Sequence, residues 1–291
     1  MRHLSSNDRR PSKPRRPADV VTPPFLSRQE RFAVVGSTND VVRGWLAEGT
    51  PEVCLAVADE QTAGRGRNGR SWQAPPGAAL LLSLGFRPDW LEPEQVWRLA
   101  ATVSLAMADA AEEVAGLPDR AITLKWPNDL YAPGAEDEPR KVAGVLGETD
   151  GLGGADPRAV IGIGVNADWP ADAFPPALTA TMTSLREASH GRPVDLAMLL
   201  DAFLSRLEVR IEALRGGRFD VADWTERQLT TGHQIELEGP DGTRTRHRAL
   251  GVDVASGGLV VEDPDATPAE RIVHVGEIRR VRLADGAQVT V

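Results

Sequence analysis

The chain has 291 residues, 41% of them hydrophobic and 26% charged, and a formal net charge of −9 at pH 7. This composition is that of a globular protein with ample apolar material for one large or two ordinary domains, and no apolar run approaches the roughly 18 residues of a membrane helix. A single cysteine, Cys54, excludes an internal disulfide framework and a cysteine-rich zinc site, and the start of the chain lacks a secretory signal, so we expect a cytoplasmic protein.

Residues 1–28 are rich in Pro, Arg and Ser and show no apolar period, which predicts a disordered basic tail. Residues 1–18 carry six Arg or Lys and one Asp, a charge of +5, so the rest of the chain carries −14. A body this acidic repels nucleic acid on average, and we expect neither a nucleic-acid nor a membrane partner. The tail is also too short for a helix-turn-helix domain.

From residue 29 the pattern changes to apolar strands and amphipathic helices. N-cap residues at 37–40 predict a helix that ends at Gly49. An apolar stripe predicts a long helix over about 94–115 that stops at Gly116, and a second stripe predicts a helix over about 195–214. Strands are predicted over 32–35, 53–58, 79–86, 122–125, 142–148 and 160–166.

This arrangement favours the α+β class, with a mixed sheet and packed helices rather than a regular parallel βαβ array. After residue 227 the chain changes to short strands separated by Gly, Pro and Asp turns. These strands are predicted over 233–238, 245–254, 258–262 and 272–283. We therefore expect a larger domain over 29–227 and a small SH3-like β-barrel over 228–291.

The loop Gly64-Arg65-Gly66-Arg67-Asn68-Gly69-Arg70 places three arginines within six positions. Glycines let backbone N–H groups approach an anion closely, and guanidinium groups pair with carboxylate or phosphate oxygens. The aromatic plane of Trp72, two residues on, suits stacking against a nucleobase. Read alone, the loop also fits an RNA-binding segment or a solvated loop.

Three further segments carry polar residues at the ends of predicted strands. Lys125-Trp-Pro-Asn-Asp129 turns sharply at its proline, and its polar residues could equally satisfy backbone donors of the turn. Lys141-Val-Ala-Gly144 has a lysine at the mouth of a strand, where a solvated charge is the simpler interpretation. Gly162-Ile-Gly164-Val-Asn166 is a strand whose glycines permit close backbone approach. Each segment alone is a weak signal.

Taken in order, Ser37-Thr38-Asn39, Gln61, the Gly/Arg loop and the three segments resemble the biotin–protein ligase family from residue 37 to 166. The β-rich end also fits the SH3-like C-terminal domain of that family. The resemblance implies a monofunctional ligase that activates biotin with ATP to biotinyl-5′-AMP. The biotinyl group then passes to a lysine of a biotin carboxyl carrier domain of an acyl-CoA carboxylase. It also implies Mg²⁺ with the ATP, and a monomer or homodimer.

The resemblance also implies a role for each matching residue. The reaction brings two anions together, so positive charge must be placed around them in advance. The catalytic residues would be Lys141, Arg67 and Asp129, where Asp129 either orients the incoming amine or caps the turn. Biotin would contact Ser37, Thr38, Asn39, Gln61, Arg65, Gly66, Arg67, Lys141 and Gly144. The nucleotide would contact Arg67, Arg70, Trp72, Asn128, Lys141 and Asn166.

Two alternative functions remain compatible with parts of the sequence. A lipoate or octanoate ligase shares the catalytic scaffold, but such proteins tend to carry an Arg-Arg, Gly-Gly-Gly and His-Asp pattern that this chain lacks. A nucleic-acid-binding protein could use the Gly/Arg loop, although the acidic body and the single copy of the motif argue against it. Lipoate-driven pyrophosphate release and salt-dependent retention on heparin distinguish these functions from biotin ligation.

Overall fold

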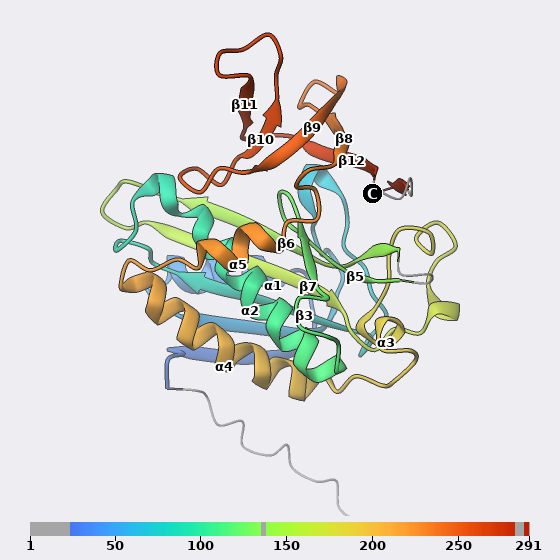
Figure 1. The fold of residues 1–291 in the computed structure, drawn as a ribbon. Coiled ribbons are helices and arrows are strands. Elements are labelled where there is room, and N and C mark those ends of the chain that lie inside the picture. The colour runs from blue at the N-terminus through green and yellow to red at the C-terminus, as the bar shows by residue number, and fades with distance from the viewer. Residues whose placement is uncertain (1–23, 135–137, 283–287, 291) are drawn as a thin grey trace, which may run out of the picture.

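The computed structural model describes residues 24–134, 138–282 and 288–290, which form two β-sheets with helices packed on the larger one (Figure 1). The larger sheet has the strand order β1-β2-β3-β7-β6-β5-β4, in which β1 and β2 are parallel and the other neighbours antiparallel. Its strands are β1 (Arg28–Val35), β2 (Cys54–Gln61), β3 (Ala79–Phe86), β4 (Thr123–Lys125), β5 (Asp129–Pro133), β6 (Pro139–Asp150) and β7 (Arg158–Asn166). The predicted mixed sheet is confirmed, and β5 is an additional strand.

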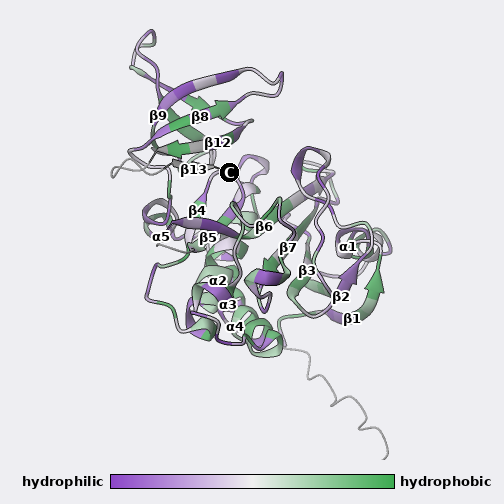
Figure 2. Ribbon diagram, turned by 90° about the vertical axis from the view of Figure 1, so that its right-hand side faces the viewer, coloured by the Kyte–Doolittle hydropathy of each residue, from purple (hydrophilic) through white to green (hydrophobic). Residues whose placement is uncertain are grey.

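The helices cover both faces of this sheet (Figure 2). Helix α1 (Thr38–Ala47) packs on one face against β2, β3 and β7, while α2 (Trp97–Ala115) and α4 (Leu196–Arg215) pack on the other. In β3 the side chains alternate, so that Leu82 and Leu84 join the large core under α2 while Gly85 faces α1. The shorter helices are α3 (Leu185–Ala188), α5 (Val221–Glu226) and the 3₁₀ turns η1 (Arg67–Gly69), η2 (Pro93–Gln95) and η4 (Ala171–Ala173).

Caps set one end of each of the two long helices. The Asp195 carboxylate accepts hydrogen bonds from the first backbone N–H groups of α4, at Ala197 (2.8 Å) and Met198 (3.2 Å). Gly116 ends α2 in the left-handed conformation at φ 59°, which glycine adopts without steric cost. The sequence analysis predicted the stop at Gly116, and α4 begins within a residue of the predicted start at about 195.

The second sheet is entirely antiparallel, with the order β11-β10-β9-β8-β12-β13, and lies at the top of Figure 1. Its strands are β8 (Gln234–Glu238), β9 (Arg244–Val252), β10 (Leu259–Glu262), β11 (Glu270–Val273), β12 (Glu277–Arg282) and β13 (Gln288–Thr290). Its apolar face packs on Trp126 and Tyr131 of the larger domain, both of which are buried. An antiparallel sheet of this size fits the predicted SH3-like module, although the pairings among the described strands do not close it into a barrel.

Two boundaries differ from the prediction. The predicted tail extends too far, because Leu26 is buried in the core and the Ser27 amide donates to Val53 O (2.7 Å); residues 1–23 lie outside the described chain. The single strand predicted over 272–283 is wrong. Two strands occupy this region instead. Strand β11 pairs with β10, and strand β12 pairs with β8, with Gly276 between the two strands.

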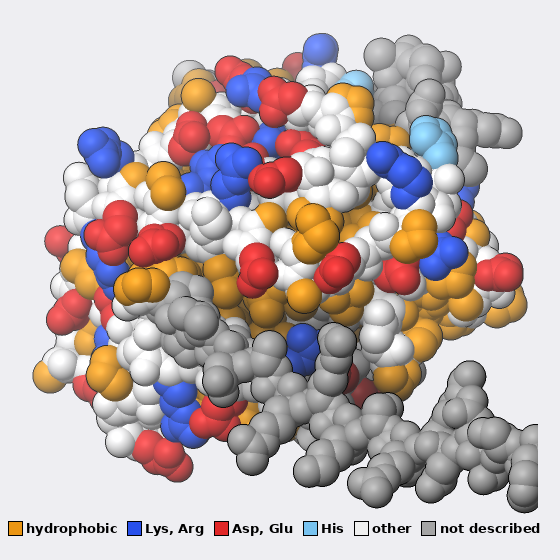
Figure 3. Space-filling model, turned by 90° about the horizontal axis from the view of Figure 1, so that it is seen from below, with side chains coloured by type: hydrophobic (Ala, Val, Ile, Leu, Met, Phe, Trp, Pro, Cys, Tyr) orange, Lys and Arg blue, Asp and Glu red, His pale blue; other side chains and the backbone are white. Residues whose placement is uncertain are grey.

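The face seen from below in Figure 3 carries acidic and basic side chains side by side, with apolar side chains between them. Between α4 and α2 of the described chain, Arg206 and Glu113 form an ion pair at 2.8 Å. None of the helices in the described part of the chain is long and apolar enough to cross a membrane.

Candidate active site

A cavity of about 380 Å³ opens where α1, the Gly/Arg loop, the β4–β5 turn, β6, β7 and β12 meet. It is lined by almost every residue that the sequence analysis selected, although they come from distant parts of the chain. The predicted residues on its wall are Ser37, Thr38, Asn39, Gln61, Arg65, Gly66, Arg67, Arg70, Trp72, Asn128, Asp129, Lys141 and Gly144.

One end of the cavity is a network of short polar groups at the start of α1. The Thr38 amide donates to Gln61 Oε1 (2.8 Å), and Asn39 Nδ2 donates to Glu148 Oε2 (2.7 Å). The Ser83 hydroxyl lies 2.7 Å from Thr38 Oγ1 and 2.6 Å from Asn39 Oδ1, and it is fully buried. These bonds fix the orientation of the polar side chains at this end of the cavity.

Close packing also holds Asn39 in place from the opposite strand. A Cβ atom added at Gly162 would lie 2.1 Å from Asn39 Oδ1, so only glycine leaves room for the amide there. Ser83 was not selected from the sequence, because it lies within the apolar run of β3. The alternation of that run does indicate that Ser83 and Leu82 point to opposite faces.

The Gly/Arg loop is folded back on itself beside this polar end. The Gly66 amide donates to Arg70 O (2.7 Å) and the Trp72 amide to Gly64 O (2.9 Å). Arg65 leaves the loop to form a bidentate pair with Asp40 of α1, at 2.7 and 2.8 Å. The hydrogen bond from Arg65 lowers the pKa of the Asp40 carboxyl, and burial opposes that shift. The loop is therefore tied to α1 on one side.

The other side of the loop is tied to the second sheet. Arg70 Nη2 lies 2.5 Å from the carboxylate of Glu277 on β12, and Asn68 Nδ2 donates to the same carboxylate (3.2 Å). Arg67 reaches Gly276 O (3.3 Å) and Asn128 Oδ1 (3.5 Å). Burial raises the pKa of the Glu277 carboxyl, but the hydrogen bond and the charge of Arg70 outweigh it, so the pKa lies below its ordinary value. Glu277 also lines the cavity and was not selected from the sequence.

The Trp72 indole lies flat against the glycines of β6 and β7. A Cβ atom at Gly164 would lie 2.5 Å from Trp72 Cε2, and one at Gly144 would lie 3.2 Å from Trp72 Cζ3. Glycine at these positions therefore makes room for the ring. Lys141 Nζ lies 5.7 Å from the ring centroid, within cation–π range.

Two lysines meet at the carboxylate of Asp129. Lys141 Nζ lies 2.7 Å from Asp129 Oδ1, and Lys125 Nζ lies 3.8 Å from Asp129 Oδ2. The pairing of β4 with β5 places Lys125 directly opposite Asp129. Lys125 is 1% exposed, and burial lowers its pKa to about 8. Among the described contacts, Asp129 pairs with these ammonium groups rather than capping the backbone of the turn.

Known proteins are similar to this chain in sequence and in architecture. The model of the biotin/lipoate A/B protein ligase family matches residues 32–166. The biotin–[acetyl-CoA-carboxylase] ligase of Mycobacterium tuberculosis is 35% identical over 213 residues, which cover 72% of this chain and 74% of that protein. The ligase of the same name from Paracoccus denitrificans is 31% identical and covers 75% of this chain and 88% of its own. This chain belongs to the biotin–protein ligase family.

A solved structure agrees with this assignment. The biotin protein ligase from Aquifex aeolicus, in complex with biotin and ATP, superposes with a TM-score of 0.70 at 25% identity. The match covers 87% of this chain and 98% of that one. The expected fold of the ligase is thereby confirmed.

One predicted site residue of the ligase lies apart from the others. Asn166 is fully buried, does not line the cavity, and donates through Nδ2 to Thr183 O (3.0 Å). Asn128 does line the cavity, and its Nδ2 donates to Val145 O (2.6 Å), which ties the turn to β6. A direct nucleotide contact from Asn166 is therefore not supported by its position, whereas Asn128 stands at the cavity wall.

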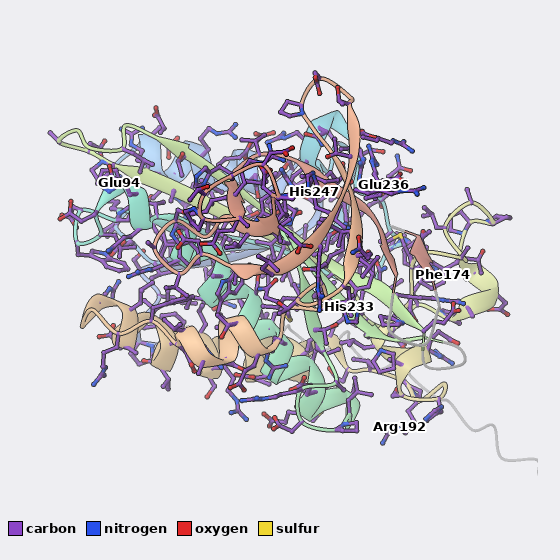
Figure 4. The ribbon with its side chains drawn as sticks, turned by 45° about the horizontal axis from the view of Figure 1, so that its top comes forward. Glu94, Phe174, Arg192, His233, Glu236 and His247 are labelled. Atoms are coloured by element: carbon purple, nitrogen blue, oxygen red, sulfur yellow. The ribbon has the colours of Figure 1, made fainter. Side chains whose placement is uncertain are left out.

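No histidine of the described chain lines the cavity, and His233 and His247 lie in or beside the second sheet (Figure 4). Within the described residues no group of three or more His, Cys, Asp or Glu could hold a metal ion. The site therefore offers positive charge and hydrogen bonds rather than a histidine base.

Proposed function

We propose that the ligase binds biotin and ATP side by side in this cavity, forms biotinyl-5′-AMP there, and transfers biotin to a lysine of a biotin carboxyl carrier domain. The observation that carries the proposal is that Lys141 lines the same cavity as the polar groups at the start of α1 and the arginines of the Gly/Arg loop. Two relatives are named biotin–[acetyl-CoA-carboxylase] ligases, and the Aquifex aeolicus structure holds biotin and ATP. The names of the two relatives and the ligands of the solved structure support this assignment.

The polar end suits the ureido ring of biotin, a flat group with two N–H donors and one carbonyl acceptor. Thr38 and Asn39 offer a hydroxyl and an amide at the cavity wall, and Gln61 holds Thr38 in place. Ser37 completes the polar set. The adjoining β-strands are apolar, which suits the hydrocarbon part of the ligand.

The cationic end suits the joining of two anions. An oxygen of the biotin carboxylate attacks the α-phosphorus of ATP, and pyrophosphate leaves with the electrons of the broken P–O bond. Lys141 and Arg67 would offset the repulsion between the carboxylate and the phosphate as they join. In the second step the neutral amine of the acceptor lysine attacks the acyl carbon, AMP leaves with the electrons of the C–O bond, and the amine loses a proton.

The residues present also fit a magnesium ion that arrives with ATP. Mg²⁺ is usually held by one or two carboxylates, several waters and substrate phosphates rather than by an all-protein cage. Asp129 and Glu277 are the described carboxylates at the cationic end, and each is paired with a lysine or an arginine. The phosphates would therefore supply most of the oxygen ligands, and the ion would neutralise charge on them.

We also propose the division of the chain into a catalytic domain over 29–227 and a C-terminal domain over 228–291. Leu124 of β4 accepts the Leu229 amide (2.8 Å) and donates its own amide to Arg227 O (2.7 Å). The linker is thus attached to the edge of the larger sheet before β8 begins. Glu277 gives the C-terminal domain a place in the cavity wall.

The assay that tests the function is ATP–pyrophosphate exchange with biotin and, separately, with lipoate. Because the polar groups suit a ureido ring, biotin should drive exchange and lipoate should not. The second step is tested by incubating the ligase with ATP, biotin and a carrier domain, beside a carrier whose acceptor lysine is replaced by arginine. Exchange driven equally by lipoate would overturn the biotin assignment, and labelling of the arginine carrier would overturn the acceptor assignment.

A further inference from the structure

Lysine is rare in this chain, and its placement is selective. The sequence has 33 Lys and Arg residues, of which only Lys13, Lys125 and Lys141 are lysines. Within the described residues both lysines meet the same carboxylate, that of Asp129. A lysine ammonium is a compact point charge, whereas an arginine guanidinium is a broad planar fork. Arginine is the usual cation of this chain, but lysine stands at both positions beside Asp129.

The two lysines differ in exposure and in distance from Asp129. The Lys141 side chain is 22% exposed and lies on the cavity wall with its Nζ at 2.7 Å from one carboxylate oxygen. The Lys125 side chain also lines the cavity but is only 1% exposed, and it faces the other oxygen at 3.8 Å, beyond hydrogen-bond distance. Among the described residues, no hydrogen-bond acceptor is paired with the Lys125 ammonium at a shorter distance than this carboxylate oxygen. The Nζ atom also lies 5.7 Å from the centroid of the Tyr131 ring.

This arrangement creates a conflict for Lys141. To offset the charge of two reacting anions, Lys141 must turn toward them and loosen its bond to Asp129. The Asp129 side chain is only 12% exposed, so water can replace little of the lost interaction. Leaving a partly buried charge without a partner is costly. Unless a second cation pairs with Asp129, its carboxylate therefore favours the position of Lys141 beside it over the position beside the two anions.

We propose that Lys125 is a positioning residue for the adenylation step, acting through Asp129. Its ammonium stays beside the carboxylate and holds it when Lys141 turns toward the biotin carboxylate and the α-phosphate. The lack of a closer partner leaves Lys125 free to approach Asp129 as Lys141 departs. This ammonium is 1% exposed, so it is poorly solvated and gains from such an approach, and the same burial lowers its pKa. The proposal rests on the proposed role of Lys141.

The test is a double-mutant cycle on the full chain, with single-turnover pyrophosphate release from ATP and biotin as the readout. The four proteins are wild type, Lys125→Met, Asp129→Asn and the double variant. Lys125→Met should slow adenylation about tenfold while the affinity for biotin changes little. In Asp129→Asn there is no carboxylate to hold Lys141, so adding Lys125→Met should slow the reaction no further.

Two results would overturn the proposal. One is an adenylation rate of Lys125→Met equal to that of wild type. The other is a double variant slower than Asp129→Asn by the full factor of Lys125→Met, because Lys125 would then act independently of Asp129. If the wild type itself releases no pyrophosphate with biotin, the proposed function fails instead, so the two failures are distinguishable.

A structural role is separated by measuring stability beside the rate. Replacing a buried ammonium with methionine removes its desolvation cost, so Lys125→Met should unfold at or above the wild-type temperature. Should that variant fail to fold, Lys125→Gln gives the same cycle under the same criteria. The matched control is Arg210→Met, which removes a cation paired with Asp109 (2.6 Å) and Asp223 (2.8 Å) outside the cavity. It should lower stability and leave the rate of the folded enzyme unchanged.

Discussion

Arg70 Nη2 lies 2.5 Å from the Glu277 carboxylate, a contact that joins the Gly/Arg loop to the second sheet across 207 residues of sequence. The loop closes one side of the cavity, and its other tether is the pair between Arg65 and Asp40. The Gly/Arg loop is therefore held between α1 and the second sheet. The second sheet thus contributes to the wall of the candidate cavity.

Removing the Glu277 carboxylate should weaken ATP binding. Glu277→Ala releases Arg70 and Asn68, and the loop loses the tether on its nucleotide side. We expect the KM for ATP to rise about tenfold, since a charge-assisted hydrogen bond contributes about 1.5–3 kcal/mol, while the KM for biotin changes less.

The control for this change is Glu236→Ala, which removes another ion-paired glutamate of the second sheet (Figure 4). Its side chain is 15% exposed, against 13% for Glu277, but it does not line the cavity. It should leave the KM for ATP unchanged. An equal effect of both variants would mean that the contact acts only through the stability of the sheet.

Removing the Ser83 hydroxyl should weaken biotin binding selectively. Ser83 lies between Thr38 and Asn39, so Ser83→Ala removes one hydrogen bond from each side chain and leaves Thr38 held by Gln61 and Asn39 by Glu148 alone. We expect the Kd for biotin, measured by calorimetry, to rise about tenfold, with ATP affinity unchanged. Ser104→Ala is the matched control, because Ser104 is also a buried serine but donates to Ala100 O (2.8 Å) within α2. Unchanged biotin affinity in Ser83→Ala would show that α1 positions these groups unaided.

Removing the Lys141 ammonium should impair chemistry more than binding. Its charge is felt most as the carboxylate and the α-phosphate join, so Lys141→Ala should lower the adenylation rate at least about a hundredfold. Lys141→Arg should not restore the full rate, because a planar fork cannot take the place of a compact ammonium beside Asp129. Single-turnover adenylate formation, measured with biotin affinity, checks both expectations. Near wild-type adenylation by Lys141→Ala would make the lysine a solvated strand-end charge.

The buried Lys125 should give the ligase a distinct pH dependence of stability. Its pKa falls from 10.5 to about 8, because burial outweighs the attraction of Asp129 and Glu277, while the charges of Lys141 and Arg70 add to the decrease. Between these two values the unfolded chain binds more protons at this site than the folded chain does. The free energy of unfolding therefore rises with pH between about 8 and 10.5. Below pH 8 this pH-dependent gain in stability from Lys125 is absent.

The measurement is urea unfolding of wild type and Lys125→Met at pH 7.5 and pH 9. From the lower to the higher pH, wild type should gain about 1 kcal/mol relative to the variant. The comparison stops near pH 9 because burial raises the pKa of the Cys54 thiol to about 11, and ionisation of that thiol in the unfolded chain then lowers stability. A difference that does not change with pH would show that Lys125 is solvated in the native protein.

The sequence by itself determined the elements and segments that depend on local pattern. The two long helices follow from their apolar stripes, and the end of α2 follows from Gly116. The Gly/Arg loop and the Lys125–Asp129 turn were identified because each concentrates its polar groups within a few residues. Their shared cavity was expected only through the resemblance to a family, since no local rule brings residues 37 and 141 together.

Tertiary structure alone decided which groups face one another across the cavity. Ser83 reaches Asn39 over 44 positions and Arg70 reaches Glu277 over 207, and neither partner carries a local signal of the other. Asn166 lies in a matching motif, yet the turn of β7 into the next segment buries it against Thr183. Burial of Lys125 depends on strands that pack around it, because a lysine exposes its charge unless the surrounding fold encloses it.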